Sequence, residues 1–502
     1  MSRLSKSQFI RGLQCQKSLW LYRNKYELRT LPSPAQEAIF GAGTDVGILA
    51  QQLFPNGHEI VYSSDKVDEN VAKTKKLIES GAETIYEATF IYDNILVMVD
   101  ILYKGKDGWE LYEVKSSSEE KSTHKNDISV QYYVLTGSGL EISVAALVHI
   151  NTGYERRGDL DIKQLFTIKD LTEAVVENQP FVKEQLTTLR EMLDGDEPQI
   201  DIGLHCSDPY ECDFHDHCWK HIPENSVFDL FRLSWKKRFE LYQKGVIKFE
   251  DIPSDYRLTK AQQLQVDAEL NMKDFINPDG IMKFLEQLEG PIGMLDFETF
   301  NPAVPPFDGQ RPYQKIAFQY SLHILDEDKL DHFEFLGEAG KDPQEELADR
   351  MIAETKDCKT ILVYNIGFER TIVKDLAKRF PDKTDDLQSI IDRMIDMMKP
   401  FQDKHYYTKE MRGKYSIKLV LPALIPELSY DGLDIGDGGM AMDAYARLQT
   451  MTDVNEMEKI KSDLLKYCGL DTYAMVKILE KMKEVVILLN KENKNDYRNE
   501  NQ

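Results

Sequence analysis

The sequence predicts an α/β protein in which two α/β blocks flank a helical linker. Its 502 residues are enough for about two or three domains. Runs rich in β-branched and aromatic residues alternate with helical stretches before residue 155 and again after residue 290, and the residues between are mostly helical in character. We therefore expect a first domain at 1–222, a helical linker at 223–287, a second domain at 288–485 and a polar tail at 486–502.

Composition restricts the class of protein. Apolar residues make up 42% of the chain and charged residues 29%, which is typical of a globular protein. No apolar run approaches the roughly 18 residues of a membrane span, and the start MSRLSKSQFIRG lacks the apolar segment of a secretory signal, so we expect a cytoplasmic protein without a membrane partner. The net charge of −24 argues against a protein that coats nucleic acid, but not against a nuclease, which gathers acids around metals.

The first block begins with helices and continues with strands. The first fifty residues have a helical pattern, and we expect strands at 84–92, 95–105, 109–117 and 142–151. Lys106-Asp107-Gly108 supplies a hairpin turn between the second and third of these strands. The block therefore has an αβββαβ-like order.

The first thirty residues are basic, against the acidic balance of the whole chain. They contain one acid, Glu27, and seven basic residues, which are Arg3, Lys6, Arg11, Lys17, Arg23, Lys25 and Arg29. This run is equally consistent with a solvated helix face and with a patch that contacts phosphates.

The hairpin of the first block carries a candidate catalytic set. Asp100 can lie opposite the strand that contains Glu113-Val114-Lys115, where Glu113 and Lys115 share a face and Val114 turns to the core. Two carboxylates can fix a metal, and an ammonium beside them can orient a hydroxide and offset charge on a phosphate. An E-x-K pair alone is common on salt-bridged strands; the upstream Asp100 and the following QYYVL make the pattern more specific.

Four cysteines are candidate ligands of a metal. Three of them are spaced six apart in CSDPYECDFHDHC, and one lies far upstream in GLQCQKSLW. In a reducing compartment such a cluster indicates metal binding before disulfides, and four thiolates can bind a [4Fe–4S] cluster or zinc. Histidine is a common zinc ligand, so the nearby histidines leave zinc as an alternative to an iron–sulfur cluster. The alternative without a metal is that the cysteines are unpaired surface residues. The residues concerned are Cys15, Cys206, Cys212 and Cys218, with His205, His215 and His217.

Together these features resemble the RecB-like PD-(D/E)XK nucleases with an iron–sulfur cluster, including the CRISPR-associated RecB-like exonucleases and the AddB-type helicase-nucleases. The resemblance covers about residues 1–222. It implies catalytic roles for Asp100, Glu113 and Lys115, substrate seating by Gln131 and Tyr132, and cluster ligation by Cys15, Cys206, Cys212 and Cys218. Two features depart from the family: Gln51 follows Gly47 where a metal-binding His is usual, and the tight C-x2-C spacing is absent.

The second block repeats the alternation. Strands are expected at 293–300, 316–325, 330–337 and 360–365, followed by helices at 368–380 and 467–482. Gly245 and Pro253 break the preceding linker into short helical pieces. The last dozen residues are polar, and we expect them to be disordered.

This block contains a second acidic set. Asp296 and Glu298 point the same way from one strand, and two adjacent carboxylates repel unless a cation neutralises them. Mg²⁺ or Mn²⁺ suits such oxygen ligands. A D-x-E pair alone is frequent by chance, and a solvated strand end is then the simpler interpretation. Further partners follow in order, namely Asn365 with Glu369 and the i,i+4 pair Tyr467 with Asp471.

This order resembles the DnaQ-like 3′–5′ exonucleases of the DEDD type, Tyr subclass, with an RNase H-like fold, over about residues 288–485. The resemblance implies that Asp296, Glu298 and Asp471 hold two metals and that Tyr467 positions the attacking water. Glu369 stands where the family usually has Asp, and Asp396 is a weaker candidate nearby. YSIKLVLPAL at 415–424 occupies the place of a helix that lines the substrate groove in such nucleases, although core packing also explains it.

The whole chain resembles a group of uncharacterised bacterial proteins that join a RecB-like nuclease to an RNase H-like exonuclease. We therefore expect a metal-dependent nuclease with two active sites, acting on DNA in preference to RNA, although the sequence does not decide between these substrates, in repair or defence. One alternative keeps a single working site. Another is a non-catalytic protein that binds nucleic acid or serves as a scaffold. The sequence does not identify a protein partner.

Overall fold

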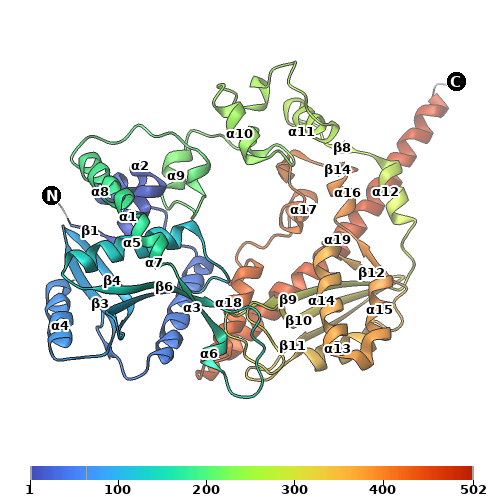
Figure 1. The fold of residues 1–502 in the computed structure, drawn as a ribbon. Helices are drawn as coiled ribbons and strands as arrows, with labels where there is room; N and C mark the ends of the chain where they lie inside the picture. The colour runs from blue at the N-terminus through green and yellow to red at the C-terminus, as the bar shows by residue number, and fades with distance from the viewer. Residues whose placement is uncertain (1–2, 64, 500–502) are drawn as a thin grey trace. The chain divides into compact units, whose positions relative to one another are not determined.

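The computed structural model describes residues 3–63 and 65–499 and has a mixed α/β architecture, as expected (Figure 1). The chain divides into two compact units. The first contains Met1–His221 together with Pro302–Gln314, and the second contains Ile222–Asn301 together with Lys315–Gln502. Among the described helices, none combines the length and the apolar character that crossing a membrane requires.

The first unit is built on a seven-stranded mixed sheet. The strand order is β2-β3-β4-β5-β6-β7, and β1 pairs with β4. The strands are β1 (Leu4–Ser5), β2 (His58–Glu59), β3 (Thr84–Tyr92), β4 (Ile95–Lys104), β5 (Trp109–Lys115), β6 (Ile142–Ile150) and β7 (Phe166–Asp170). The helices are α1 (Lys6–Gln14), α2 (Gln16–Asn24), α3 (Pro34–Ala50), α4 (Val67–Glu79), α5 (Ser122–Gly137), α6 (Ile162–Leu165), α7 (Thr172–Glu177), α8 (Gln179–Leu193) and α9 (His215–Trp219).

The alternating burial of the strands explains how this sheet is covered. Leu111 of β5 packs into a core shared with α1, α5 and α8, whereas its neighbour Tyr112 packs into a second core shared with α3. Successive side chains of a strand point to opposite faces, so both faces of the sheet are buried. The four expected strands of this block are present. Strand β7 was not predicted, because four of its five residues are exposed and it is a short edge strand without an apolar alternation.

The second unit contains a five-stranded sheet in the order β11-β10-β9-β12-β13. Strand β10 is antiparallel to β9 and β11, and β12 is parallel to β9 and β13. The strands of the unit are β8 (Phe275–Ile276), β9 (Ile292–Phe300), β10 (Ile316–Asp326), β11 (Lys329–Leu336), β12 (Thr360–Val363), β13 (Met394–Asp396) and β14 (Tyr406–Tyr407). The helices are α10 (Trp235–Tyr242), α11 (Lys260–Asn271), α12 (Pro278–Leu285), α13 (Gln344–Glu354), α14 (Ile366–Arg379), α15 (Thr384–Asp392), α16 (Lys399–Gln402), α17 (Ile417–Leu424), α18 (Gly438–Leu448) and α19 (Val454–Asn499).

Central strand β9 separates two cores of this unit. Leu295 and Phe297 pack with α13, α14 and α15, which lie along one face of the sheet (Figure 1). Met294 packs into the other core, with α12, α17 and α19. Because residues two apart on a strand share a face, Asp296 and Glu298 lie on the α19 side of β9.

Two stretches differ from the expected organisation. Residues 223–287, expected as a linker, group with the C-terminal sheet, and β8 within them pairs with β14. The end of the chain, expected to be disordered, continues α19 as far as Asn499; residues 500–502 lie outside the described residues. Once a helix is nucleated by packing, each added residue gains a backbone hydrogen bond at little cost, which a polar composition does not prevent.

Candidate active sites

Three carboxylates converge in the second unit. Asp296 and Glu298 come from β9 and Asp471 from α19, and each offers an oxygen such that the three atoms lie within 4.8 Å of one another. Glu298 and Asp471 are buried, and Asp296 is half-buried. Oxygens bound to one Mg²⁺ at about 2.1 Å lie at most about 4.2 Å apart, so this cluster is close to the size of a metal site.

Two contacts from β10 hold α19 over the acids of β9. Ser321 Oγ lies 2.7 Å from Thr472 Oγ1, and Gln319 Nε2 donates to the carbonyl of Leu464 at 2.8 Å. Ser321 and Gln319 are the cross-strand partners of the two β9 acids. The register of the β9–β10 pair therefore also sets the position of α19.

Burial raises the pKa of all three acids of this site, and the charge of Asp471 adds to the shift of the other two. Burial, followed by repulsion from Asp471, raises the pKa of Glu298 to about 8 and the pKa of Asp296 well above its usual range. Burial also raises the pKa of Asp471 to about 6, although Tyr430 and Lys418 oppose that shift. Carboxyls that resist ionisation together are the electrostatic signature of a site that accepts cations.

Glu369 extends the acidic cluster from α14. It is buried in the first turn of that helix, and its Oε2 has no hydrogen-bond partner among the described residues. Burial and the charges of Glu298 and Asp471 raise its pKa well above the usual range. An unpaired buried carboxylate is costly, so the atom is positioned for a ligand that the protein itself does not supply.

The remaining residues predicted for this site divide into two groups. Tyr467 is buried, and the pKa of its phenol is raised by burial and by the charge of Asp471. Asp396 does not join the triad; its Oδ1 accepts the backbone N–H groups of Asn365 and Met398, at 3.3 and 3.0 Å. Asp396 therefore caps the local backbone at the end of β13.

Two residues near Asp471 were not predicted. Tyr430 donates from its hydroxyl to Asp471 Oδ1 at 2.5 Å, and its ring centroid lies 6.3 Å from that of Tyr467. Lys418 of α17 places its amine 5.0 Å from the centre of the Tyr467 ring. Tyr430 stands in the irregular segment between α17 and α18, where no helix or strand period relates it to the acids. Lys418 lies in the 415–424 stretch that the sequence suggested as a groove-lining helix.

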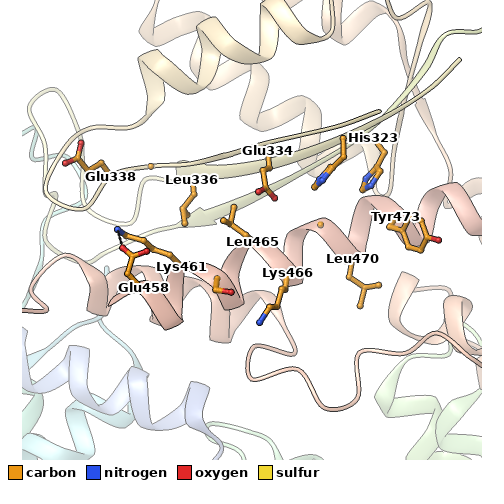
Figure 2. Close-up of a pocket in the computed structure, with 14 residues that line it drawn as sticks. His323, Glu334, Leu336, Glu338, Glu458, Lys461, Leu465, Lys466, Leu470 and Tyr473 are labelled. Carbon is orange, nitrogen blue, oxygen red and sulfur yellow. Dashed lines mark hydrogen bonds and ion pairs between the residues drawn. The ribbon is translucent and has the colours of Figure 1, made fainter. Parts of the chain in front are cut away.

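An open pocket with a volume of about 910 Å³ lies beside α19, but it does not contain the acids (Figure 2). It is lined by residues of β10, β11 and α19, including the stacked rings of His323 and His332, whose centroids are 4.1 Å apart. Burial lowers the pKa of His323 to about 4, and its Nδ1 lies 2.8 Å from Thr472 Oγ1. This pocket contributes none of the candidate metal ligands.

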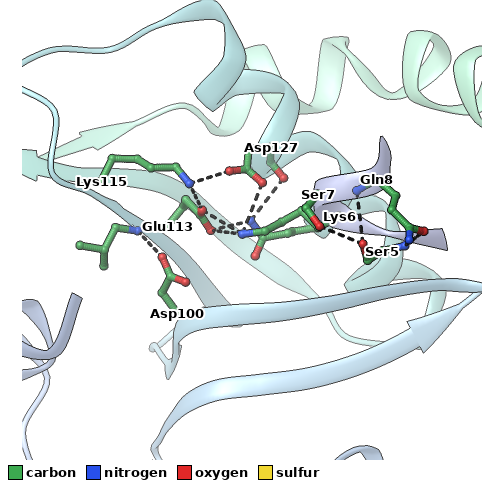
Figure 3. Close-up of polar contacts among 10 residues, drawn as sticks. Ser5, Lys6, Ser7, Gln8, Asp100, Glu113, Lys115 and Asp127 are labelled. Atoms are coloured by element: carbon green, nitrogen blue, oxygen red, sulfur yellow. Dashed lines mark hydrogen bonds and ion pairs between the residues drawn. The ribbon is translucent and has the colours of Figure 1, made fainter. Parts of the chain in front are cut away.

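A second polar site lies in the first unit (Figure 3). Glu113 Oε1 accepts from the amine of Lys115 at 2.5 Å, and Glu113 Oε2 accepts from Gln131 Nε2 at 2.6 Å. Asp100 Oδ2 accepts the backbone N–H of Val114 at 2.7 Å. The hairpin and α5 thus bring together Asp100, Glu113, Lys115 and Gln131, the residues predicted from the sequence.

Three further charged residues belong to this site. Lys6 donates from its amine to both oxygens of Glu113, at 2.9 and 3.0 Å, and Asp127 pairs with Lys115 at 2.7 Å and with Lys6 at 3.3 Å (Figure 3). Glu87 lies within β3 with a φ of 55°, between Tyr86 and Ala88, which pair with Ile101 and Val99 of β4. Lys6 belongs to the basic run noted in the sequence, and Asp127 precedes Gln131 by one helical turn. No sequence pattern near Glu87 relates it to the other residues of the site.

The charges of this site oppose one another. Burial raises the pKa of Asp100 to about 7, with Glu113 adding to the shift. Burial acts in the same direction on Glu113, but the ammonium groups of Lys115 and Lys6 outweigh it and lower the pKa of that carboxyl. Burial, followed by the charge of Glu113, raises the pKa of Asp127. The ammonium groups therefore favour the ionised form of Glu113, whereas burial favours the protonated forms of Asp100 and Asp127.

Two residues that the family pattern brought into consideration make other contacts in the structure. Tyr132 is partly buried and packs against the core of the first unit. Gln51 lies in a short 3-10 helix (Gln51–Leu53), and its carbonyl accepts from the Tyr86 hydroxyl at 3.2 Å.

The four cysteines line one small cavity. Cys15, Cys206, Cys212 and Cys218 surround it, together with His205 and His215 but not His217. Within residues 3–63 and 65–499, no three of these thiols have sulfur atoms all within 4.8 Å of one another. Tetrahedral zinc with Zn–S bonds of about 2.3 Å holds its sulfurs about 3.8 Å apart, so these thiols do not stand at the spacing of a zinc–thiolate site.

Polar contacts support the walls of this cavity. The Ser18 N–H donates to Cys15 Sγ at 3.4 Å, and the Gly203 N–H donates to Cys206 Sγ at 3.5 Å. Arg11 forms a two-point ion pair with Asp213, the residue after Cys212, at 2.5 and 3.0 Å. The Arg11–Asp213 pair joins the N-terminal helices to the 206–218 segment.

Comparison with known proteins gives similarity without a function. A domain of unknown function (DUF2779) matches residues 293–416, which include Asp296, Glu298 and Glu369. The chain is 25% identical over 203 residues to the uncharacterized protein MG366 homolog of Mycoplasma pneumoniae, covering 36% of this chain and 31% of that protein. It is 24% identical over 211 residues to uncharacterized protein MG366 of Mycoplasma genitalium, covering 37% and 31%. The similarity thus spans about a third of the length of these curated relatives.

Proposed function

We propose that this chain is a metal-dependent nuclease that hydrolyses phosphodiester bonds of DNA at two active sites. The observation that carries the proposal is the convergence of Asp296, Glu298 and Asp471, whose carboxylate oxygens lie within 4.8 Å of one another although the residues are far apart in the sequence. Their raised pKa values and the unpartnered Oε2 of Glu369 fit a cation-binding site.

The donor set selects the metal and the roles of the residues. Carboxylates are hard ligands that suit Mg²⁺ or Mn²⁺. When bound, such ions supply Lewis-acid stabilisation of the attacking and leaving oxygens of a phosphodiester. In this proposal Asp296, Glu298 and Asp471 hold the ions, Glu369 completes the cluster, and Tyr467 orients the attacking water.

The topology supports an RNase H-like assignment of the second unit. A central strand that bears two acids, an antiparallel strand pair on one side, parallel strands on the other and a late helix that bears Tyr467 and Asp471 follow the order expected of DnaQ-like exonucleases. We therefore propose 3′–5′ exonuclease activity for this site. DNA is favoured over RNA, and repair or defence as the setting, by the resemblance alone.

For the first unit we propose a PD-(D/E)XK-type site. Asp100 and Glu113 would hold a divalent cation, and Lys115 would orient the nucleophile and offset charge on the phosphate. The contacts of Glu113 with Lys115 and Gln131 support this assignment, because they place an ammonium and an amide at the same carboxylate.

We also propose that the four cysteines hold a [4Fe–4S] cluster. All four thiols line one cavity without standing at the spacing of a zinc–thiolate site, and backbone N–H groups donate to Cys15 and Cys206. Zinc bound with histidine is the alternative. Such a group would join the first helices to the end of the unit and stabilise it as a long-range cross-link.

Cleavage of end-labelled DNA and RNA by three variants tests the catalytic proposal. Asp296→Asn should lower the rate of digestion from the 3′ end by at least about 100-fold. Lys115→Met should remove a second metal-dependent activity. Asp396→Asn is the matched control, because this nearby carboxylate caps local backbone, and it should retain both activities.

The same assay separates the alternatives. Loss of one activity only, with no second activity in the wild type, would leave a single working site. Binding of DNA that survives chelation, without cleavage of either substrate in Mg²⁺ or Mn²⁺, would indicate a non-catalytic binding protein. Digestion that is unchanged in both active-site variants would overturn the proposal.

A further inference from the structure

Glu113 of the first unit has no acceptor capacity left for a metal. Its Oε1 accepts from Lys6 at 2.9 Å and from Lys115 at 2.5 Å, and its Oε2 accepts from Lys6 at 3.0 Å and from Gln131 at 2.6 Å (Figure 3). An ionised carboxylate offers about four lone-pair positions, and all four are used here. A divalent cation can therefore bind Glu113 only when one of these donors leaves.

The structure distinguishes the donor that can leave. Gln131 is fully buried on α5, and its Nε2 also approaches the Asp127 carbonyl at 3.3 Å. Lys115 is two residues from Glu113 on β5, and its amine lies 2.7 Å from Asp127, closer than the 3.3 Å between Lys6 and Asp127. Lys6 reaches the site from 107 residues away, through a flexible four-carbon stem.

A helix cap holds the backbone at Lys6. Lys6 is the first residue of α1, and Ser5 caps that helix by accepting the Gln8 N–H at 3.2 Å, while the Gln8 side chain accepts from the Ser5 N–H at 3.3 Å. A reciprocal cap of this kind holds the helix start. Release of Glu113 by Lys6 therefore needs only rotation of its side chain.

We propose that Lys6 is a second functional lysine of the first unit, which exchanges Glu113 for a phosphate of the nucleic acid when the divalent cation binds. This inference rests on the proposed nuclease function of that site. The freed ammonium would stand beside the metal-bound carboxylates, where a phosphate oxygen is the anion that the substrate brings. Lys6 would thus contact substrate, in addition to Lys115.

The exchange has a thermodynamic consequence. Without nucleic acid the ammonium of Lys6 competes with the cation for Glu113, which lowers the affinity of the site for metal. With nucleic acid the phosphate binds the ammonium and removes the competitor. Metal and nucleic acid should therefore strengthen each other's binding, and by linkage the two effects are equal.

Binding of Mn²⁺ to the full-length chain tests this exchange. The Asp296→Asn background weakens the metal site proposed for the second unit, Glu113→Gln in the same background identifies the binding that belongs to the first unit, and free Mn²⁺ is measured by electron paramagnetic resonance. The DNA probe is a duplex with single-stranded ends and phosphorothioate linkages. The compared proteins carry Lys6, Lys6→Met, or the control Lys25→Met, which removes a basic residue of the same N-terminal run that pairs instead with Glu197 at 2.8 Å.

The expected results are specific to Lys6. With Lys6 present, DNA should tighten Mn²⁺ binding by about tenfold, and Lys25→Met should behave in the same way. Lys6→Met should bind Mn²⁺ about tenfold more tightly without DNA, and DNA should add little more. Lys6→Gln, which keeps a neutral amide donor for Glu113, should show the same loss of coupling.

Two outcomes would overturn the inference in distinguishable ways. Unchanged or weaker Mn²⁺ binding in Lys6→Met, with the response to DNA intact, would show that Lys6 only anchors the helix. Binding of Mn²⁺ that Glu113→Gln does not alter would instead remove the proposed metal site of the first unit, and the exchange with it.

Discussion

Tyr430 and Asp471 form a hydrogen bond of 2.5 Å between residues that are 41 positions apart in the chain. The acceptor is one of the three carboxylates that converge in the second unit. Tyr467, one turn before Asp471 on α19, also stands beside this carboxylate, so two phenols share one candidate metal ligand. They differ in origin, because Tyr467 is carried by the helix and Tyr430 by an irregular segment.

We predict that the two phenols have separable roles. Tyr467→Phe should lower kcat by about 100-fold at saturating Mn²⁺, because it removes the group proposed to orient the attacking water. Tyr430→Phe should instead weaken Mn²⁺ binding by about tenfold and leave kcat at saturating metal near that of the wild type, because it removes only a hydrogen bond to a metal ligand. Titration of exonuclease activity with Mn²⁺ measures both quantities. Equal losses of kcat in the two variants would contradict this division.

The raised pKa of Glu298 predicts a pH dependence of stability in the metal-free protein. Its pKa is about 8 in the folded state, against about 4.3 in an unfolded chain, so the folded state binds more protons in this window. The free energy of unfolding contributed by this group should therefore fall as pH rises from about 4 to about 8.

Denaturant unfolding with a chelator at pH 5, 6.5 and 8 measures this contribution. Glu298→Gln, which cannot ionise, should be less sensitive to pH than the wild type over the same range. Saturating Mg²⁺ should reduce the loss at pH 8, because the cation compensates the ionised carboxylate. A wild type and variant with parallel pH profiles would show that Glu298 titrates normally.

The sequence predicted the parts of each site that have a local period. Asp296 and Glu298 share a face because strand side chains alternate, and Tyr467 and Asp471 share a face because residues four apart are neighbours on a helix. The structure brings the three acids among them together. The α/β class followed from the same periods, because the strands that support both sites are long and buried.

The parts that were not predicted depend on tertiary contacts. Lys6 reaches Glu113 across 107 residues, and Tyr430 reaches Asp471 from a segment without regular structure. No spacing rule relates such pairs. The grouping of residues 223–287 with the second unit likewise depends on packing. The composition of this stretch predicted only that it is helical.

We predict that the cysteine cavity gives the purified protein a colour. Protein prepared without oxygen should be brown, and Cys15→Ala and Cys212→Ala should each remove the colour, because each thiol lines the cavity. Both variants should also lower Tm by at least about 5 °C, because the cluster would join distant segments. Cys358→Ala is the matched control, since this buried thiol lies in the second unit, and it should keep the colour. A colourless wild type with stoichiometric zinc would replace the cluster by zinc.

The left-handed backbone conformation of Glu87 predicts a trade between stability and activity. Its φ of 55° lies in the left-handed region, which is unfavourable for a residue with a Cβ by roughly 1 kcal/mol, and burial raises the pKa of its half-buried carboxyl. Glu87→Gly should therefore increase the free energy of unfolding in urea by about 0.5–1 kcal/mol.

The same change should lower the activity proposed for the first unit, because it removes an acid whose charge acts on Lys6 and Glu113. Glu87→Ala removes the carboxyl but keeps the Cβ, so it should lose the activity without the gain from backbone freedom. Equal stability of the Gly and Ala variants would show that the backbone at this position is not strained.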